Sequence, residues 1–283
     1  MTTDNTNTTR NDSLAARTDT WLQSLLVWSP GQRDIIKTVA LVLMVLDHAN
    51  RILHLDQSWM FLVGRGAFPL FALVLEGSVN RAVLGSSLGG VLAGNLWLYA
   101  LYGGLAAGIF EKCGRYAAFR VARKWSRGPG DALMYGAGHG GIEAVLLTGV
   151  TMVNNIVLSL AINRGGLEAV EQLTGPLPES TQAALAALTT APAGVYLWSG
   201  FERLTAVVLH IALSVLVYAA VTRRGQWYWF PAAIALHALV DMAAVVTGAS
   251  CPIVVTEVVA ALAAAAVALL AWRVYRGEPM ENA

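Results

Sequence analysis

The sequence predicts an all-α protein, a polytopic transmembrane helix bundle of about seven spans, and three observations support this. Of the 283 residues, 56% are hydrophobic and only 13% are charged, which is about half the charge of a typical soluble domain. Mean hydropathy is +0.55. The apolar residues gather into runs close to the ~20 residues that a helix needs to cross a bilayer. Because lipid tolerates no unpaired backbone groups, such runs must be helices.

The apolar runs set the expected organisation of the chain. They lie at roughly Ile35–Leu53, Trp59–Val79, Val83–Ile109, Ile142–Ile162, Leu204–Val221, Tyr228–Val246 and Ile253–Tyr275. The third run is long and glycine-rich, which predicts a break or two passes. We expect a disordered polar tail (1–30), a two-helix N-terminal segment (31–83), a membrane core (84–276) and a C-terminal tail (277–283).

Charged loops predict the orientation. The densest basic stretch lies between the third and fourth runs and holds Lys112, Arg115, Arg120, Arg123, Lys124 and Arg127. The positive-inside rule places this stretch in the cytoplasm, together with Arg223–Arg224 and Arg273–Arg276. The acidic loop from Arg164 to Glu202 then falls outside. Seven spans put the N-terminus outside despite its basic residues, so either the third run crosses twice or the front pair was added to a scaffold of different orientation.

Composition also limits the partners. A net charge of +1 offers no basic surface for nucleic acid, so no nucleic-acid partner is expected. Membrane lipids are the expected surroundings, in a multi-pass protein of the cell membrane, the bacterial inner membrane being the expected compartment. Cys113 and Cys251 match no zinc motif and form no disulfide framework.

Polar side chains inside the predicted spans are the candidate functional residues, because a charge at the bilayer centre costs at least ~2.5–3.5 kcal/mol. They fall into four clusters, Glu111 with Arg115, Tyr135 with His139 and Glu143, Glu202–Arg203 with His210, and His237 with Asp241. Residues four apart share a helix face, so three helices each direct a histidine and a carboxylate inward. Such groups hold a metal or activate water.

A structural role is the alternative for every cluster. Each histidine–carboxylate pair taken alone is explained by a buried hydrogen bond, and Glu202–Arg203 by an anchor at the membrane interface. Three of the five histidines lie in such pairs, which favours a common polar site. Gly138, Gly140 and Gly141 around His139 would let another backbone or a substrate chain approach closely.

The four clusters, in this order and with the segment Gly-His139-Gly-Gly-Ile-Glu143-Ala, resemble the YhfC family of intramembrane peptidases over about residues 96–246. That family is related to the CAAX-protease and bacteriocin-processing superfamily. The resemblance implies that Glu111 is the base that activates water and that Arg115 orients it. It also implies that Tyr135 and His139 form the aromatic-x-x-x-His element, in which His139 is a second water-activating group or a metal ligand. His237 and Asp241 would bind metal or stabilise the oxyanion.

The resemblance further implies a membrane-protein or peptide substrate, cleaved by water that Glu111 and His139 activate with or without a zinc ion. The ligands of such an ion would be drawn from His139, Glu143, His210, His237 and Asp241. These exceed four, so some would lie outside the coordination sphere. The superfamily has a second glutamate where this chain has Lys112. A lysine there would retune the base, or would mark a relative without activity.

The N-terminal segment resembles a different family. Asp34 to His48, and Gly64-Arg65-Gly-Ala-Phe-Pro69, are similar to the opening of TraX, the pilin acetylation protein, over about Ser29–Val83. This implies an acyl-handling pair, Asp47 and His48, with Arg51 and Arg65 facing an anionic cofactor. The leading hypothesis is an intramembrane peptidase. The alternatives are a TraX-like membrane acetyltransferase and an inactive binding or immunity-type protein.

Overall fold

The computed structural model describes residues 58–126, 128–190 and 192–277, and within them the chain is helical with no strand. The elements are α3 (Ser58–Phe68), η1 (Pro69–Glu76), α4 (Gly77–Leu84), α5 (Ser87–Ala93), α6 (Leu96–Ala122), η2 (Arg123–Trp125), α7 (Gly130–Glu143), η3 (Ala144–Gly149), α8 (Val150–Thr174), α9 (Glu179–Thr190), α10 (Ala193–Thr222), α11 (Trp229–Ser250) and α12 (Ile253–Arg276). The predicted tail 1–30, the run Ile35–Leu53, and Asp47 and His48 lie outside the described residues.

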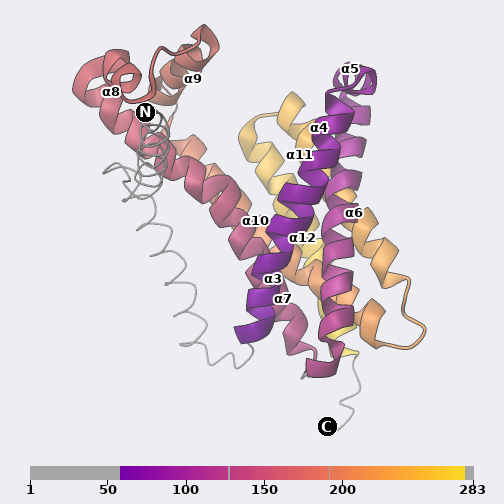
Figure 1. Cartoon of the computed structure of the whole chain (residues 1–283). Coiled ribbons are helices and arrows are strands. Elements are labelled where there is room, and N and C mark those ends of the chain that lie inside the picture. The colour runs from indigo at the N-terminus through magenta and orange to yellow at the C-terminus, as the bar shows by residue number, and fades with distance from the viewer. Residues whose placement is uncertain (1–57, 127, 191, 278–283) are drawn as a thin grey trace, which may run out of the picture.

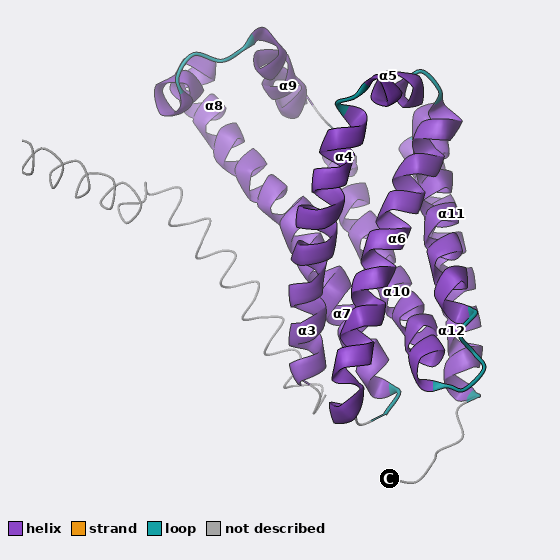
Figure 2. Ribbon diagram, turned by 45° about the vertical axis from the view of Figure 1, so that its right-hand side comes forward, coloured by secondary structure: helices purple, strands orange, loops and turns teal. Residues whose placement is uncertain are grey.

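The polytopic helical fold is confirmed (Figures 1 and 2). Five helical stretches of the described residues are long and apolar enough to cross a membrane, namely Met60–Leu84, Gly130–Gln172, Gly194–Thr222, Trp229–Ser250 and Ile253–Arg276. A bent pair of helices, α5 and α6, makes a sixth. Each coincides with a run predicted from Trp59 onward. Large apolar side chains such as Leu197, Leu204 and Leu262 are exposed on these helices, as contact with lipid requires.

The third predicted run is one pass with a sharp bend. Its axis turns by 115° between α5 and α6, where Asn95 caps α6 by accepting hydrogen bonds from the backbone of Trp97 and Leu98. Helix α5 has only seven residues, about 10 Å of length, against a hydrocarbon core of about 30 Å. The break expected at the glycine cluster is confirmed, and the alternative of two passes is wrong.

The end predicted for this run is also wrong. Helix α6 continues beyond Ile109 to Ala122, so Glu111 lies within the helix. Lys112 and Arg115, predicted as loop residues, are fully buried. Hydropathy counts a charge as a loop residue even when the partners that stabilise it lie on other helices, and this explains the error. Arg120, Arg123 and Lys124 remain exposed at the end of α6.

The basic ends of the helices gather at one end of the bundle (Figure 2). Ser126, after α6, lies 2.9 Å from the hydroxyl of Tyr218 near the end of α10. Arg223 donates a 2.6 Å hydrogen bond to the carbonyl of Val274 near the end of α12. The α8–α9 loop lies at the opposite end (Figure 1). This grouping agrees with the predicted loop placements, and the assignment of the basic end to the cytoplasm stays a prediction.

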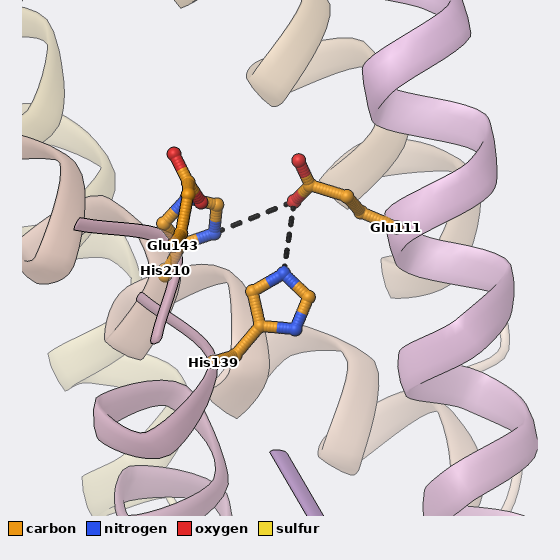
Figure 3. Close-up of side chains that lie close together, drawn as sticks. All are labelled: Glu111, His139, Glu143 and His210. Atoms are coloured by element: carbon orange, nitrogen blue, oxygen red, sulfur yellow. Dashed lines mark hydrogen bonds and ion pairs between the residues drawn. The ribbon is translucent and has the colours of Figure 1, made fainter. Parts of the chain in front are cut away.

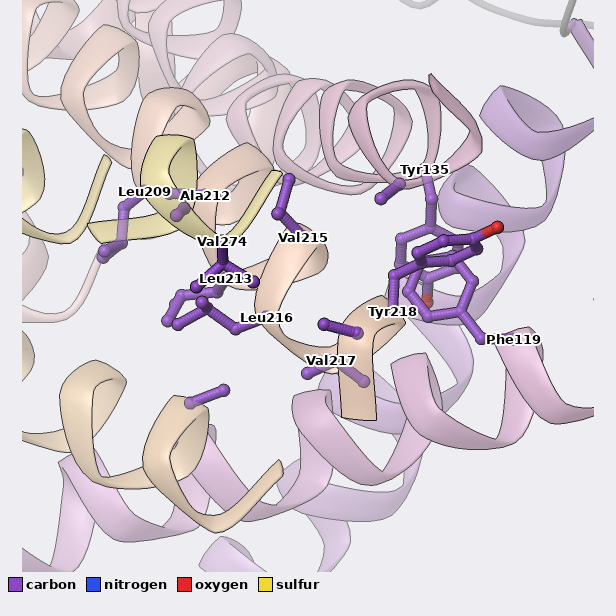
Figure 4. Close-up of a cluster of buried hydrophobic side chains, with 14 of the residues drawn as sticks. Phe119, Tyr135, Leu209, Ala212, Leu213, Val215, Leu216, Val217, Tyr218 and Val274 are labelled. Carbon is purple, nitrogen blue, oxygen red and sulfur yellow. The ribbon is translucent and has the colours of Figure 1, made fainter. Parts of the chain in front are cut away.

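Helix α10 is the centre of the bundle. In its most apolar stretch 61% of the residues are buried, against 28% or less in the other membrane-crossing helices of the described chain. Leu213, Leu216 and Val217 on α10 are fully buried. Aromatic rings fill the space beside them, with Phe119 of α6 4.8 Å from Tyr135 of α7 between ring centroids (Figure 4). This packing fixes α6, α7 and α10 against one another.

Glycines on two faces of α7 allow close helix approach. A Cβ on Gly138 would lie 2.2 Å from the carbonyl oxygen of Phe61 in α3, and one on Gly136 would lie 2.5 Å from Cα of Ile211 in α10. A Cβ on Gly140 would lie 3.0 Å from Cα of Val207 in α10, whereas Gly141 faces open space. The expected close approach is therefore confirmed for Gly138 and Gly140, whose partners are helix backbones of this chain.

Replacing Gly138 by alanine and replacing Gly141 by alanine are expected to have opposite effects on stability. Gly138→Ala should destabilise the protein by about 1–3 kcal/mol or more, since backbone atoms of α3 must move away from the new methyl group. Gly141→Ala should be neutral or stabilising by up to about 1 kcal/mol, because alanine is the better helix former and meets no neighbour. Thermal unfolding in detergent measures both. Equal effects would show that α3 and α7 do not pack this closely.

Candidate metal centre

Four helices bring the predicted polar clusters to one place in the bundle interior. Helix α6 supplies Glu111, α7 supplies His139 and Glu143, α10 supplies His210, and α11 supplies His237. All five are buried. Figure 3 shows Glu111, His139, Glu143 and His210 pointing toward one another from three helices. Side chains that lie up to 126 residues apart in the sequence therefore form one site.

Glu111 is the hub of this site. Its Oε2 atom lies 3.2 Å from Nζ of Lys112 and 3.3 Å from Nε2 of His139. The same oxygen is 3.5 Å from Nδ1 of His210, 3.8 Å from Nδ1 of His237 and 3.9 Å from Nη2 of Arg115. A buried carboxylate is stable only when charge and hydrogen bonds compensate it. The two basic side chains of α6 and the surrounding imidazoles provide this compensation.

Arg115 fixes the orientation of His210. Its guanidinium lies over the ring of Tyr135, 5.7 Å from the ring centroid, and its Nη2 is 3.2 Å from Nδ1 of His210. Arginine can only donate, so Nδ1 of His210 accepts and Nε2 carries the proton. That nitrogen faces Oε2 of Glu143 at 2.6 Å. The role that the resemblance implies for Arg115, orienting Glu111, stays a prediction, and the structure adds His210 as its contact.

His139 has a ring nitrogen without a partner. Its Nε2 faces Glu111, while its buried Nδ1 forms no hydrogen bond. The ring stacks on Tyr135 with centroids 5.9 Å apart, and Phe68 of α3 meets it edge-on at 5.2 Å. These aromatic contacts hold the imidazole in place. An unpaired buried nitrogen costs free energy unless something binds it.

His237 is engaged at both ring nitrogens. Its Nδ1 lies 2.6 Å from Nζ of Lys112, and an ammonium group can only donate. Its Nε2 therefore carries the proton and faces Oδ2 of Asp241 at 3.4 Å. The predicted pairing of His237 with Asp241 is present. The contact with Lys112 joins residues 125 apart and has no signal in the sequence.

Arg203 connects Glu143 to Glu202. Its Nη1 is 3.2 Å from Oε1 of Glu143, and it forms an ion pair with Glu202. Both acids line a cavity of about 110 Å³ together with His210, His237 and Asp241. A larger groove of about 470 Å³ between α8 and α10 contains none of these residues. The small cavity therefore adjoins the centre, and the larger groove does not.

Glu257 of α12 also lines this cavity and was missed in the sequence clusters. It is 6% exposed, and its Oε2 forms no hydrogen bond. The signal was present, because Glu257 is the single charged residue in the run from Ile253 to Trp272. By contrast, the predicted acyl-handling pair Asp47–His48 lies outside the described residues, and Arg65 is placed on α3 over the ring of Phe61.

The buried residues fit a metal ion. Glu111, His139, Glu143 and His210 each offer one ligand atom, and these atoms lie within 4.8 Å of one another. Nitrogen and carboxylate oxygen are the donor types that zinc takes in catalytic sites. Around the centre, five carboxylates (Glu111, Glu143, Glu202, Asp241 and Glu257) face three bases (Lys112, Arg115 and Arg203). Carboxylates thus outnumber basic side chains around the centre. Of the predicted ligands, His139, Glu143 and His210 lie in this group and His237 and Asp241 do not.

The fold and this centre define a polytopic membrane protein with buried histidine and carboxylate side chains that converge between its helices. The chain belongs to the YhfC intramembrane metalloprotease family, whose model matches residues 38–263. This match is wider than the predicted stretch of about 96–246 and includes α3.

Individual relatives agree with both predicted resemblances. The uncharacterized membrane protein YhfC of Bacillus subtilis (strain 168) is 38% identical over 189 residues, which cover 66% of this chain and 72% of that protein. Protein TraX of Escherichia coli (strain K12) is 90% identical over 81 residues, 29% of this chain and 33% of TraX. A second Escherichia coli TraX is 89% identical over the same length. The chain thus spans about a third of the TraX relatives it matches. No solved structure matches the chain significantly.

Proposed function

We propose that this protein is an intramembrane metallopeptidase that hydrolyses peptide bonds within or near the bilayer. One observation carries the proposal, the convergence of Glu111, His139, Glu143 and His210 within 4.8 Å inside a membrane bundle. A purely structural cluster needs no such concentration of ligand atoms, and charged groups within a membrane are costly unless they serve a function. Membership of a metalloprotease family supports the same conclusion.

Three of these residues are the proposed ligands of zinc. Glu111, His139 and His210 would hold the ion and leave a fourth position open, as catalytic zinc sites do. When bound, zinc polarises the scissile carbonyl and makes a water molecule more acidic. For His210 to bind the ion, its Nδ1 lone pair, which accepts from Arg115, would go to zinc instead, while Nε2–H stays directed at Glu143. Tyr135 and Phe68 hold the ring of His139.

Glu143 is the proposed base that takes the proton from water. It lines the cavity that reaches the centre, whereas Glu111 is enclosed by Lys112, Arg115 and the imidazoles. The resemblance assigned the base to Glu111, and its position among cations supports the role of ligand better. His237, whose Nε2–H group is oriented by Lys112 and Asp241, is the proposed donor to the developing oxyanion.

Metal-dependent peptide hydrolysis tests the proposal. Protein reconstituted in liposomes with added zinc is incubated with a pool of hydrophobic peptides, and mass spectrometry detects new termini. We expect cleavage that stops with the chelator 1,10-phenanthroline and returns on adding zinc. The non-chelating isomer 1,7-phenanthroline is the matched control. Zinc-loaded protein that cleaves no peptide would overturn the proposal and favour the inactive, binding-type alternative.

The acetyltransferase alternative depends on the TraX-like segment. It rests on Asp47 and His48, outside the described residues, and on a match to a third of TraX. Within the described part of that segment, α3 packs its Phe61 backbone against Gly138 of α7, so the segment contributes to the bundle that carries the centre. Acyl-CoA binding by the purified protein, dependent on Arg51 and Arg65, would favour this alternative.

A further inference from the structure

The cavity beside the metal centre extends to a part of the bundle that the proposed chemistry does not use. Glu143 and His210 line it at the centre, and Thr256 and Glu257 of α12 line it on another side. It is bounded by the first half of α10, the second half of α11 and the start of α12. In Figure 2 these parts lie toward the end of the bundle opposite the basic loops. The cavity therefore leads from the centre toward that end.

The carboxylate of Glu257 is buried with one oxygen unpaired among the described residues, and Arg203 is the cation whose charge acts on it. The residue is 94% buried, since 6% of its surface is exposed, and its Oε2 atom forms no hydrogen bond. The Oγ1 atom of Thr256 in the same wall is also buried without a partner. An unpaired carboxylate in a membrane interior is costly. A group from outside the chain that pairs with Glu257 would remove this cost.

The charge of the cavity determines which group fits. Its wall carries four carboxylates, those of Glu143, Glu202, Asp241 and Glu257, and Arg203 is the one lysine or arginine among its lining residues. Arg203 already contacts Glu143 and Glu202, and Asp241 faces His237. The carboxylate of Glu257 is thus left for a positively charged visitor.

The rest of the wall distinguishes an organic cation from a metal ion. Between the polar groups lie Ala206, Leu209, Val240, Ala244 and Ala260. Three of the four carboxylates already face Arg203 or His237. This leaves Glu257 for a single charged contact, rather than a shell of carboxylate ligands for Ca²⁺ or Mg²⁺. A primary ammonium on a methylene chain matches this wall, because the chain contacts apolar surface while the charged head pairs with a carboxylate. A volume of about 110 Å³ accommodates several atoms of this kind.

We infer that this cavity binds a primary alkylammonium group of the substrate, with Glu257 as its counter-ion. The inference rests on the proposed peptidase function, and it deepens that function by naming the substrate class. A lysine side chain and a free amino terminus both carry this group. Either would be held next to Glu143, so the peptide bond that is cleaved lies close to a positive charge of the substrate.

Binding of n-butylammonium tests the cavity without any catalytic step. We expect it to raise the unfolding temperature of the detergent-purified protein in a saturable way, whereas n-butanol does not. In Glu257→Gln the affinity should be at least about tenfold weaker, because a charge-assisted hydrogen bond is lost. The variant should fold, since the buried Oε2 of Glu257 forms no hydrogen bond that would be lost. Glu168→Gln, an exposed acid on α8, is the matched control and should bind like the natural chain.

Cleavage of designed peptides distinguishes the two sources of the group. Three peptides share one hydrophobic sequence, the first with lysine and an acetylated terminus, the second with norleucine in place of lysine, and the third with norleucine and a free terminus. We expect the first or the third to be cleaved at least tenfold faster than the second. Glu257→Gln should remove this preference, and Glu257→Lys should transfer it to a peptide with glutamate at that position.

The binding experiment and the cleavage experiment together separate a failure of the inference from a failure of the proposed function. Saturable butylammonium binding that depends on Glu257, in a protein that cleaves nothing, would support the cation site and overturn the peptidase. Cleavage of all three peptides at one rate, with no binding of butylammonium, would overturn the inference and leave the peptidase standing. Equal butylammonium binding by the natural chain and Glu257→Gln would also overturn it.

Discussion

Zinc binding is expected to be lost when His139 or His210 is replaced by alanine, and to persist when His237 is replaced. Both of the first two residues offer a ligand atom to the group that lies within 4.8 Å. His237 is not in this group, and its ring nitrogens face Lys112 and Asp241 instead. Removing even an outer-sphere group costs about 10–100-fold in metal affinity, so we expect a loss of at least about 100-fold for a ligand.

Mass-spectrometric metal content of detergent-purified protein measures this, with about one zinc per chain expected in the natural sequence and in His237→Ala. Far-ultraviolet circular dichroism checks that each variant keeps its helices. His139→Asn serves as a second variant, because it retains a polar side chain between Phe68 and Tyr135. Equal loss of zinc in His237→Ala would support the larger ligand set predicted from the sequence pairs. A natural protein without zinc would contradict the metal site.

Peptide hydrolysis is expected to fall by about 10²–10⁴-fold in Glu143→Gln while zinc content stays unchanged. General base catalysis contributes about this factor, and glutamine keeps the shape of the side chain but takes up no proton. Oε1 of Glu143 contacts Arg203 and Oε2 faces His210, contacts that an amide can partly retain. The measurement is kcat and KM on one peptide, together with metal content of the same preparation.

Glu111→Gln makes the comparison decisive. If Glu111 is a ligand, this variant loses zinc and activity together, whereas Glu143→Gln loses activity alone. The reverse result, with zinc kept in Glu111→Gln and lost in Glu143→Gln, would return the base to Glu111, as the family resemblance implies. Glu168→Gln again controls for the removal of a carboxylate at a site far from the centre.

Local patterns in the sequence were sufficient for the fold class and for the residues of the centre. A run of apolar residues determines that a segment enters the membrane as a helix, because no other backbone conformation is satisfied there. A histidine four residues from a carboxylate predicts that both share a helix face. His139 and Glu143 thus entered the predicted site from spacing alone, as did His237 and Asp241.

Hydropathy was least informative where charge is buried. Lys112 and Arg115 lowered the apolar signal of α6 and were interpreted as loop residues, although both are fully buried. Glu257 was overlooked for the opposite reason, since one acid in a strongly apolar run hardly changes its mean hydropathy. In both cases the property that matters, whether a charge has a partner, depends on other helices.

The sequence alone therefore determined which segments are membrane-crossing helices and most of the polar residues within them, but not the end of α6 or the place of Glu257. Only the tertiary structure determined which of these polar side chains contact one another. Contacts such as that between Lys112 and His237 join residues 125 apart, and helix packing positions them through close approaches such as that of Gly138 to Phe61. Periodicity describes one helix at a time, whereas the centre depends on the rotation and depth of four helices relative to one another, and packing sets these.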